Sequence, residues 1–390
     1  MGSQRRPEAA WLGLDLGTQS VRAMLVSETG EIIGIGSEKL NSQRSGGKHE
    51  QIPDEWWSAA SAACRAALAS LPAASSVAGV AVDGTSGTIL LADPRSRPLT
   101  PGLMYDDTRA VDEAKRVNEV GATVWQRLGY NRMQASWGLP KLLWLLKHHG
   151  PLTDDVRLMH QSDFINERLV GESVATDTSN ALKTGVDLVS ERWPHQVFAD
   201  LGVPAEILPP VVRAGTVLGS VSAEASVETS LPQGTPVIAG MTDGCAAQIG
   251  AGALSVGSWN TVLGTTLVLK GVSVNLIKDP AGVVYCHRSP DGNWLPGGAS
   301  STGAGAISKH FPGRDLEALA TKAAAREPAS AVSYPLPGRG ERFPFVVPEA
   351  EGFSLGQPTD EIDHYASLLQ GVALVERLCF DYLEMLGAPV

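Results

Sequence analysis

The chain has 390 residues, of which 43% are hydrophobic and 19% charged, and it carries a net charge of −11 with a pI near 5.2. This length favours two domains over one average core. The acidic balance argues against nucleic acid or an anionic membrane as the main partner, because both require a basic surface. No run of residues approaches the roughly 18 apolar positions of a membrane span, so no membrane segment is expected.

Four cysteines are spread along the chain and form no Cys-x-x-Cys pair: Cys64, Cys245, Cys286 and Cys379. This arrangement indicates neither a zinc site nor a disulfide framework. It suits a reducing compartment, and the N-terminus lacks the apolar segment of a secretion signal, so the cytoplasm is the expected location. The oligomeric state is left open.

The first predicted element is a pair of strands around a polar turn. Residues 11–14 and 21–26 are rich in aliphatic and β-branched residues, and Gly17 lets the chain reverse between them. The turn Asp15-Leu-Gly-Thr-Gln-Ser20 brings together a carboxylate, hydroxyls and backbone amides. A carboxylate can hold Mg²⁺ and amides can bind an anion, so the turn is either a phosphate site or an ordinary hairpin.

Strands and helices then alternate, which indicates an α/β fold. The expected elements are a strand at 31–35, a polar loop at 40–53, a helix at 55–68 capped by Asp54, and strands at 77–82 and 89–92. Residues 110–200 are predicted to be mainly helical, including 139–147 and 162–169.

A second domain is expected after the proline-rich connection at 231–236. Its predicted elements are a strand at 237–239, a helix at 244–251, two strands within 257–270, a loop at 296–305 and a long amphipathic helix at 362–386. The sequence ends at Val390, shortly after that helix.

Four polar turns lie at the ends of predicted strands: 15–18, 83–88, 242–244 and 264–266. Each turn alone could be ordinary turn chemistry. Together they place acids and hydroxyls where α/β folds bind ligands, and they do so in both halves of the chain.

At this point the chain resembles the FGGY family of carbohydrate kinases, within the actin and hexokinase ATPase fold. The motifs that carry the resemblance are Asp15-Leu-Gly-Thr18, His49-Glu-Gln-Ile-Pro-Asp-Glu-Trp-Trp57, Tyr105-Asp-Asp-Thr-Arg-Ala110, Leu139-Pro-Lys-Leu-Leu-Trp144, Asp163-Phe-Ile-Asn-Glu-Arg-Leu-Val-Gly171 and Gly240-Met-Thr-Asp-Gly244. A short xylulokinase-like subgroup, whose members phosphorylate D-ribulose, is similar at 83–91, 180–183 and 334–344.

The resemblance implies an α/β fold of two actin-like, ribonuclease H-like ATPase domains with a cleft between them. The implied division is an N-terminal sugar-binding domain at 10–235 and a C-terminal nucleotide-binding domain at 236–390. In the family, a strand and a Gly-Gly-Gly-Ala loop that holds adenosine follow the long helix. The second domain is therefore expected to be truncated and incomplete at Val390.

The resemblance also implies ATP and Mg²⁺ as cofactors and a small-molecule sugar as the substrate. Asp243 is the expected general base, with a helix cap as its alternative role. Asp15, Ser86 and Asp243 would bind the sugar, and Asp15 would also hold the metal. The residues expected to contact the nucleotide are Gly17, Thr18, Gln19, Gly264, Thr265 and Gly298.

Two conspicuous features have competing interpretations. Asp107 and Arg109 match a Trp-x-Asp-x-Arg sugar motif of longer family members, but Tyr105 replaces the Trp, so a surface ion pair is the alternative. The adjacent Trp56 and Trp57 are interpreted as helix packing rather than as a sugar platform.

The leading hypothesis is an ATP-dependent ketopentose kinase, with D-ribulose as the first acceptor and D-xylulose as the second. The first alternative is a non-catalytic sugar or nucleotide sensor derived from a kinase. The second is an actin-like ATPase that works on protein partners, which the helical block at 110–200 argues against because it resembles sugar-kinase insertions.

Overall fold

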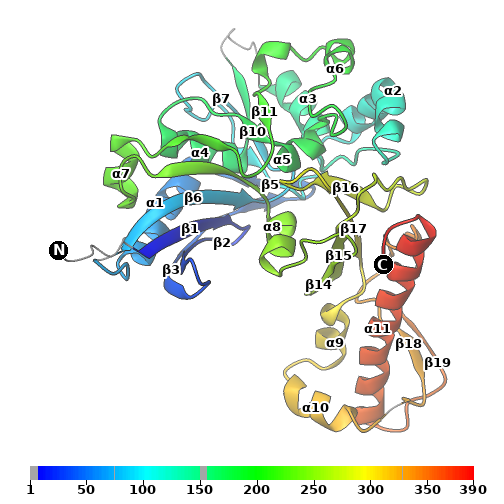
Figure 1. The fold of residues 1–390 in the computed structure, drawn as a ribbon. Helices are drawn as coiled ribbons and strands as arrows, with labels where there is room; N and C mark the ends of the chain where they lie inside the picture. The colour runs from blue at the N-terminus through cyan, green and yellow to red at the C-terminus, as the bar shows by residue number, and fades with distance from the viewer. Residues whose placement is uncertain (1–7, 74, 150–155, 327) are drawn as a thin grey trace. The chain divides into compact units, whose positions relative to one another are not determined.

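The computed structural model describes residues 8–73, 75–149, 156–326 and 328–390. They form two compact units, which are considered separately (Figure 1). The first unit takes in the chain up to residue 128, residues 132–247 and residues 287–292. The second takes in residues 129–131, 248–286 and 293–390.

A six-stranded sheet organises the first unit, with the strand order β12-β13-β6-β1-β2-β3. Its strands are β1 (Glu8–Leu16), β2 (Ser20–Ser27), β3 (Ile32–Lys39), β6 (Ser75–Gly84), β12 (Val217–Ser220) and β13 (Pro236–Thr242). The three central strands β13, β6 and β1 run parallel, whereas β2, β3 and β12 are antiparallel to their neighbours. The sheet therefore has one edge at which three strands end together.

Alternating apolar residues fix which side of this sheet is buried. In β1, Ala10, Leu12, Leu14 and Leu16 are all buried, as the period of two in a strand requires. Helix α1 (Pro53–Leu68) packs against β2 and β3, and α4 (Gln161–Val170) packs against β6, β12 and β13.

The rest of the first unit is a smaller sheet with a set of helices. The order of the smaller sheet is β4-β5-β8-β7-β9, formed by β4 (Gln43–Ser45), β5 (Lys48–Gln51), β8 (Gly102–Leu103), β7 (Ile89–Ala92) and β9 (Arg157–His160). A parallel pair joins β10 (Thr176–Asp177) to β11 (Val211–Val212). The helices are α2 (Val111–Arg127), α3 (Gly138–His148), α5 (Thr178–Ala181), α6 (His195–Leu201) and α7 (Ala223–Thr229), with 3₁₀ turns at Leu182–Thr184 and Ala205–Ile207.

The chain leaves the first unit within α8 (Asp243–Gly250). A four-stranded sheet of order β14-β15-β17-β16 follows, formed by β14 (Trp259–Leu263), β15 (Leu267–Gly271), β17 (Trp294–Ser300) and β16 (Tyr285–Arg288), of which the last two residues of β16 are grouped with the first unit. The second unit also contains α9 (Ala304–His310), α10 (Leu316–Ala323), the antiparallel pair β18 (Val332–Tyr334) and β19 (Phe353–Leu355), and the long helix α11 (Glu361–Met385). Helices α9, α10 and α11 share one apolar core.

Several sequence expectations are confirmed. The hairpin around 15–20 is β1 and β2, the strands at 77–82 and 89–92 lie in β6 and β7, and the long amphipathic helix is α11. Trp56 and Trp57 are both buried in the core, as a packing role requires. None of the helices in the described part of the chain combines the length and apolarity needed to cross a bilayer.

Three expectations are wrong in detail. The segment 40–53 contains the hairpin of β4 and β5; its polar composition hid these strands because β4 is exposed along its whole length. Asp54 does not cap α1, because Pro53 with its fixed φ begins the helix after Ile52. The first part of the expected loop at 296–305 is the buried strand β17.

The strand that we expected to open the second domain is part of the first unit's sheet. This strand, β13, pairs in parallel with β6, so the first compact unit extends past residue 235 to residue 247. The division into functional domains at 235/236 stays a prediction.

Close approach of β13 to β6 requires a glycine at position 240. A Cβ built on Gly240 would lie 2.1 Å from the carbonyl oxygen of Val82, a backbone atom that cannot move without parting the strands. We expect Gly240→Ala to lower the free energy of unfolding by about 3 kcal/mol, near the upper end of the usual cost of overpacking. Urea unfolding followed by tryptophan fluorescence measures this change.

The matched control is Gly13→Ala in β1 of the same sheet, because a Cβ at Gly13 would meet nothing within 4 Å. That variant should keep its stability. Equal stability of the two variants would contradict the close approach of β13 to β6.

Candidate functional site

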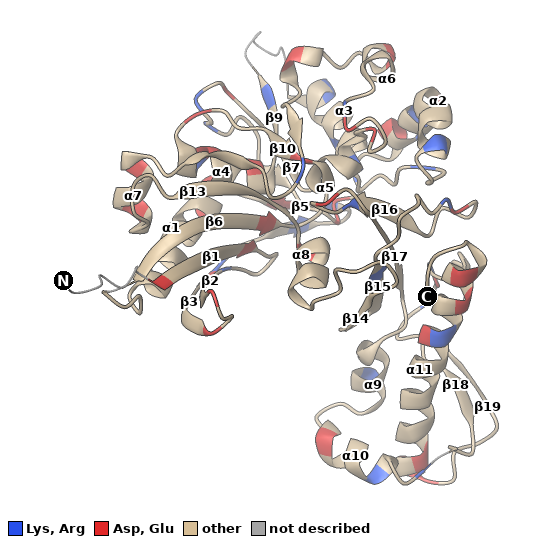
Figure 2. Cartoon of the chain, viewed as in Figure 1, with Lys and Arg blue, Asp and Glu red and all other residues tan. Residues whose placement is uncertain are grey.

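Three aspartates lie where three neighbouring parallel strands end. Asp15 of β1 is paired in register with Asp83 of β6. Thr242, the last residue of β13, is paired with Gly84, and Asp243 follows it as the first residue of α8. Acidic residues are visible at the tips of β1 and β6 (Figure 2). The structure thus brings the predicted residues Asp15 and Asp243 to one sheet edge, where α/β folds bind ligands.

Asp83 is the third member of this group, and the sequence reasoning quoted it only as part of a turn. Like Asp15, it comes at the end of a strand whose apolar residues alternate into the core. That shared position was the signal that could have identified it. The parallel register of β1 and β6, which the sequence does not state, makes Asp83 a neighbour of Asp15.

The charge state of Asp83 differs from that of an ordinary aspartate. Burial raises its pKa to about 8, together with the negative charges of Asp15 and Asp243 and a hydrogen bond to Asp15. Its Oδ1 is buried and has no hydrogen-bond partner among the described residues. At neutral pH Asp83 is therefore protonated and can share its proton with Asp15, which removes one of three like charges from the edge.

The turn after Asp15 is held by side chains as well as by its own backbone. The N–H of Gly17 donates to the carbonyl of Ser20 at 3.1 Å, so closing the hairpin already uses this amide. Gln51 donates from Nε2 to the carbonyl of Thr18 at 2.7 Å and accepts from Nε1 of Trp56 at 2.7 Å. The tip at Thr18 and the exposed Gln19 is thereby fixed against α1.

Ser86 offers a buried hydroxyl that forms no hydrogen bond with any of the described residues. Its neighbour Thr85 bonds to Oγ1 of Thr88 at 2.6 Å and to Oε1 of Gln161 at 2.8 Å. Lys183 donates from Nζ to the carbonyl of Ser86 at 3.2 Å, which fixes the backbone. The Oγ of Ser86 itself is buried and unpaired within the described ranges. A buried unpaired hydroxyl costs roughly 1–3 kcal/mol, which a ligand hydroxyl would recover.

Asp243 combines an exposed carboxylate with a position at a helix start. Its Oδ1 accepts from the N–H of Gly244 at 2.6 Å. The pairing of β13 with β6 shifts register between Ala239 and Thr242, and this irregularity sets the direction in which the chain leaves the sheet. A helix-terminal contact and an accessible carboxylate therefore coexist in one residue.

Asp107 and Arg109 form a buried ion pair, which corrects the alternative of a surface pair. The side chain of Asp107 is 0% exposed and that of Arg109 is 6% exposed. Arg109 donates from Nη2 to Oδ2 of Asp107 at 2.7 Å and lies 2.7 Å from Oε1 of Glu50. Oδ2 of Asp107 also accepts from the N–H of His49 at 2.7 Å, and the guanidinium lies 4.7 Å from the centre of the Trp144 ring. These contacts give the pair a role in fixing its loop.

Lys141 supports the same loop from beneath. It is fully buried, and its Nζ donates to the carbonyls of Leu103 and Met104 at 3.2 and 2.7 Å. Burial lowers the pKa of Lys141 to about 7, against the charge of Asp107, which raises it. The Leu139–Trp144 motif thus acts through a buried amine that holds the backbone ahead of Asp107.

In the second unit, the turn between β14 and β15 carries Gly264 and Thr265 and packs on the start of α9. The carbonyl of Gly264 accepts from the N–H of Ala304 at 2.9 Å, and that of Thr265 accepts from Gly305 at 3.2 Å. Thr265 is exposed. Gly298 lies apart from this turn, buried within β17, where a Cβ would come 2.8 Å from the ring of Phe343. Packing therefore accounts for the glycine at 298.

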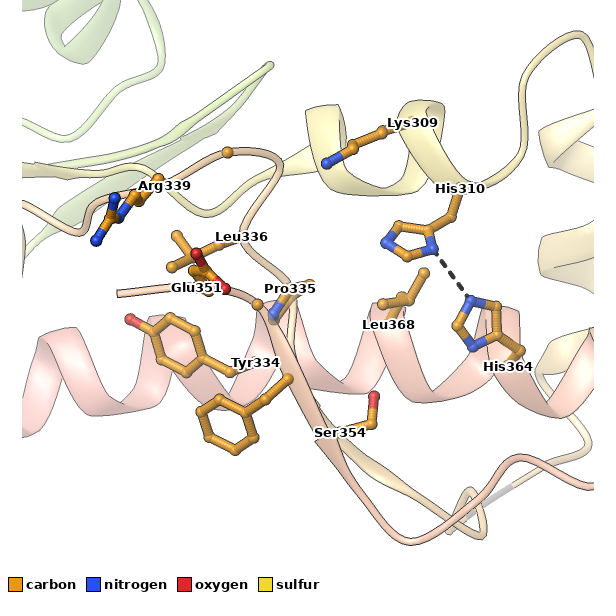
Figure 3. Close-up of a pocket in the computed structure, with 13 residues that line it drawn as sticks. Lys309, His310, Tyr334, Pro335, Leu336, Arg339, Glu351, Ser354, His364 and Leu368 are labelled. Carbon is orange, nitrogen blue, oxygen red and sulfur yellow. Dashed lines mark hydrogen bonds between the residues drawn. The ribbon is translucent and has the colours of Figure 1, made fainter. Parts of the chain in front are cut away.

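The second unit also contains a pocket of about 480 Å³ (Figure 3). His310 of α9 and His364 of α11 face each other across one end, with 3.3 Å between ring nitrogens. Burial lowers the pKa of His310, and the charges of His364 and Lys309 lower it further. The described residues that line the pocket include none of the residues predicted from the sequence to contact the nucleotide.

Within the residues that the structure describes, no group of three or more His, Cys, Asp or Glu side chains is arranged as a metal cage. Mg²⁺ does not need one, because it keeps several waters and binds through one or two carboxylates together with substrate phosphates. Asp15 fits that pattern, since its side chain is 40% exposed, and its Oδ2 lies 3.9 Å from Nη1 of Arg22.

The raised pKa of Asp83 makes the stability of the fold depend on pH. Unfolded Asp83 ionises near pH 4 and folded Asp83 near pH 8, so the fold loses stability as pH rises between these values. We expect Asp83→Asn, which can still donate to Asp15, to be more stable than the wild type at pH 8, by roughly 1–3 kcal/mol after allowance for solvent screening. Urea unfolding at pH 5 to 9 measures the difference.

Asp112→Asn is the control for this series, because Asp112 is exposed and forms its ion pair with the exposed Lys115. It should reproduce the wild-type dependence on pH. A wild-type slope in Asp83→Asn would show that Asp83 is ionised in the folded protein.

Comparisons with known proteins agree with this fold. The family model described as "FGGY family of carbohydrate kinases, N-terminal domain" matches residues 10–250. Xylulose kinase from Klebsiella pneumoniae is 27% identical over 358 residues, covering 89% of this chain and 72% of that protein. Xylulose kinase from Streptomyces rubiginosus is 31% identical over 292 residues, covering 73% of this chain and 59% of that protein.

Solved structures extend the likeness along nearly the whole chain. The crystal structure of xylulose kinase from Rhodospirillum rubrum has a TM-score of 0.85 at 26% identity and covers 97% of this chain and 80% of that one. Plasmodium falciparum glycerol kinase with ADP has a TM-score of 0.85 at 16% identity, which shows the fold alone. The fold is thus the two-domain actin-like α/β fold of these kinases. The chain belongs to the FGGY family of carbohydrate kinases, which are sugar phosphotransferases.

Proposed function

We propose that this protein transfers the γ-phosphate of ATP to the terminal hydroxyl of a ketopentose. The observation that carries the proposal is the edge of the large sheet, where the exposed carboxylate of Asp243 stands beside Asp15 and Asp83. In phosphoryl transfer the protein mainly positions the reactants and stabilises charge. A carboxylate can act as the general base that accepts the proton of the attacking hydroxyl.

The residues of the first unit have separate roles in sugar binding, proton transfer and phosphate binding. Asp243 accepts the proton of the attacking hydroxyl, and Ser86 bonds to another sugar hydroxyl through its unpaired Oγ. Asp15 also bonds to the sugar, and the neighbouring Asp83, whose pKa is raised to about 8, holds a proton beside it at neutral pH. Thr18 and Gln19 lie at the tip of the adjoining turn and face the phosphate, with Gly17 closing that turn behind them.

Bound Mg²⁺ supplies charge neutralisation on the phosphates, and Asp15 would hold it through its water shell. In the second unit, we assign contact with ATP to the exposed turn at Gly264 and Thr265. Gly298 keeps only its packing role beside Phe343 in this assignment.

D-xylulose is the better supported acceptor. Relatives from Klebsiella and Streptomyces are named xylulose kinase, and they align over most of this chain. D-ribulose is the alternative acceptor, because residues 83–91 resemble a subgroup whose members phosphorylate D-ribulose. A relative from Salmonella choleraesuis, 30% identical over 249 residues, is named autoinducer-2 kinase, so the acceptor must be determined with a panel of compounds.

The direct test is ADP release from Mg·ATP with a panel of D-xylulose, D-ribulose, other ketoses and polyols. We expect release that requires sugar and is greatest with D-xylulose. Asp243→Asn, which keeps the size of the side chain and its helix-start contact, should lower kcat by about 10²- to 10⁴-fold while sugar still binds.

Asp200→Asn, a substitution of an exposed aspartate in α6, serves as the control and should leave kcat unchanged. Sugar binding without any ADP release would instead indicate a sensor. ATP turnover that is indifferent to sugar would indicate an ATPase acting on other partners. Near-normal kcat in Asp243→Asn would remove Asp243 as the base.

Ser86→Ala should separate binding from stability. Removing an unpaired buried hydroxyl should leave the free energy of unfolding unchanged or raise it slightly, because none of the described residues bonds to that oxygen. Loss of a sugar contact should raise KM for the sugar by about 5- to 20-fold, which corresponds to the usual free-energy contribution of one hydrogen bond. Steady-state kinetics and urea unfolding on the same preparation measure both, and an unchanged KM would contradict the assignment.

A further inference from the structure

The orientation of Asp243, the proposed general base, depends on the backbone immediately before it. The N–H of Thr242 donates to Oγ of Ser179 at 2.8 Å. This bond joins the end of β13 to α5, a segment more than 60 residues earlier in the chain. Thr242 is 1% exposed and Ser179 is 0% exposed, so water does not compete for the bond.

Ser179 is itself held in a single orientation by Asp177. Oδ1 of Asp177 accepts from Oγ of Ser179 at 2.6 Å and from its N–H at 2.8 Å. The same carboxylate accepts from Asn180, through the N–H at 3.0 Å and Nδ2 at 2.6 Å. Because the hydroxyl proton of Ser179 is directed to Asp177, its oxygen lone pair is left for the N–H of Thr242.

The bond acts at the last residue of β13, just after the regular pairing of this strand is interrupted. The β13–β6 register shifts between Ala239 and Thr242, and pairing resumes only at Thr242, which lies opposite Gly84. Thr242 ends the strand and directly precedes Asp243, the first residue of α8. A fixed peptide at Thr242 therefore sets where the carboxylate of Asp243 points.

We propose that Asp177 and Ser179 are positioning residues that hold Asp243 in its reactive orientation through the backbone of Thr242. The proposal rests on the function assigned above to Asp243. It gives a role to the Asp177–Asn180 segment, of which the sequence analysis had noted only Asn180.

The first test does not depend on turnover. In Ser179→Ala of the full chain, amide hydrogen exchange of peptides covering 240–247 should quicken by about tenfold or more, because Thr242 loses its acceptor. Ser61→Ala is the matched control: Ser61 is 3% exposed in α1, and its Oγ lacks a hydrogen-bond partner in the described chain. Exchange at 240–247 that is equal in wild type and in both variants would overturn the proposal.

The second test separates positioning from loss of structure. Ser179→Ala should lower kcat by about 10- to 100-fold, while the sugar Kd stays within about threefold and binding stoichiometry stays complete. Ser179→Cys, which keeps a weaker acceptor of similar size, should fall between Ser179→Ala and wild type in both measurements. It also replaces Ser179→Ala in both tests if that variant does not fold.

Faster exchange with an unchanged kcat would overturn the proposal, because the bond would then hold the backbone without serving Asp243. Failure of the proposed function looks different. In that case Asp243→Asn itself keeps its kcat, whatever Ser179→Ala does to exchange at 240–247.

Discussion

Parallel pairing of β1, β6 and β13 is the constraint on which the candidate site depends. Strands that run in the same direction end at the same edge, so the residues that follow them meet regardless of their distance in sequence. Here that rule gathers Asp15, Asp83 and Asp243. Three like charges at one edge repel, and the raised pKa of Asp83 shows how the fold relieves this repulsion.

The polar groups around this edge are held by side chains that are not themselves part of the predicted site. Gln51 fixes the turn after Asp15, Lys183 fixes the backbone of Ser86, and Ser179 fixes the backbone before Asp243. Each of these contacts goes to a backbone atom, so the reactive side chains stay available. Such contacts preorganise a site before any ligand arrives.

The same arrangement distinguishes polar residues that serve structure from those open to a ligand. The carboxylate of Asp107 has both oxygens engaged by Arg109 and a third bond from His49, although the pair matched a sugar motif. Ser86 has a buried oxygen that nothing in the described chain uses. Unsatisfied hydrogen-bonding capacity, more than motif identity, separates the two cases.

The sequence by itself determined the α/β class, the family resemblance, the hairpin at Asp15 and the helix α11, because these depend on local periodicity and on motifs of adjacent residues. It also placed Asp15, Ser86 and Asp243 at strand ends. It missed β4, β5 and β17, because the exposure of an edge hairpin and the packing of Gly298 under Phe343 are set by distant neighbours. Only the tertiary structure decided that Asp83 is a partner of Asp15, that Arg109 is buried, and that Ser179 bonds to Thr242. Strand register, burial and long-range hydrogen bonds join residues far apart in the chain, and no local pattern encodes them.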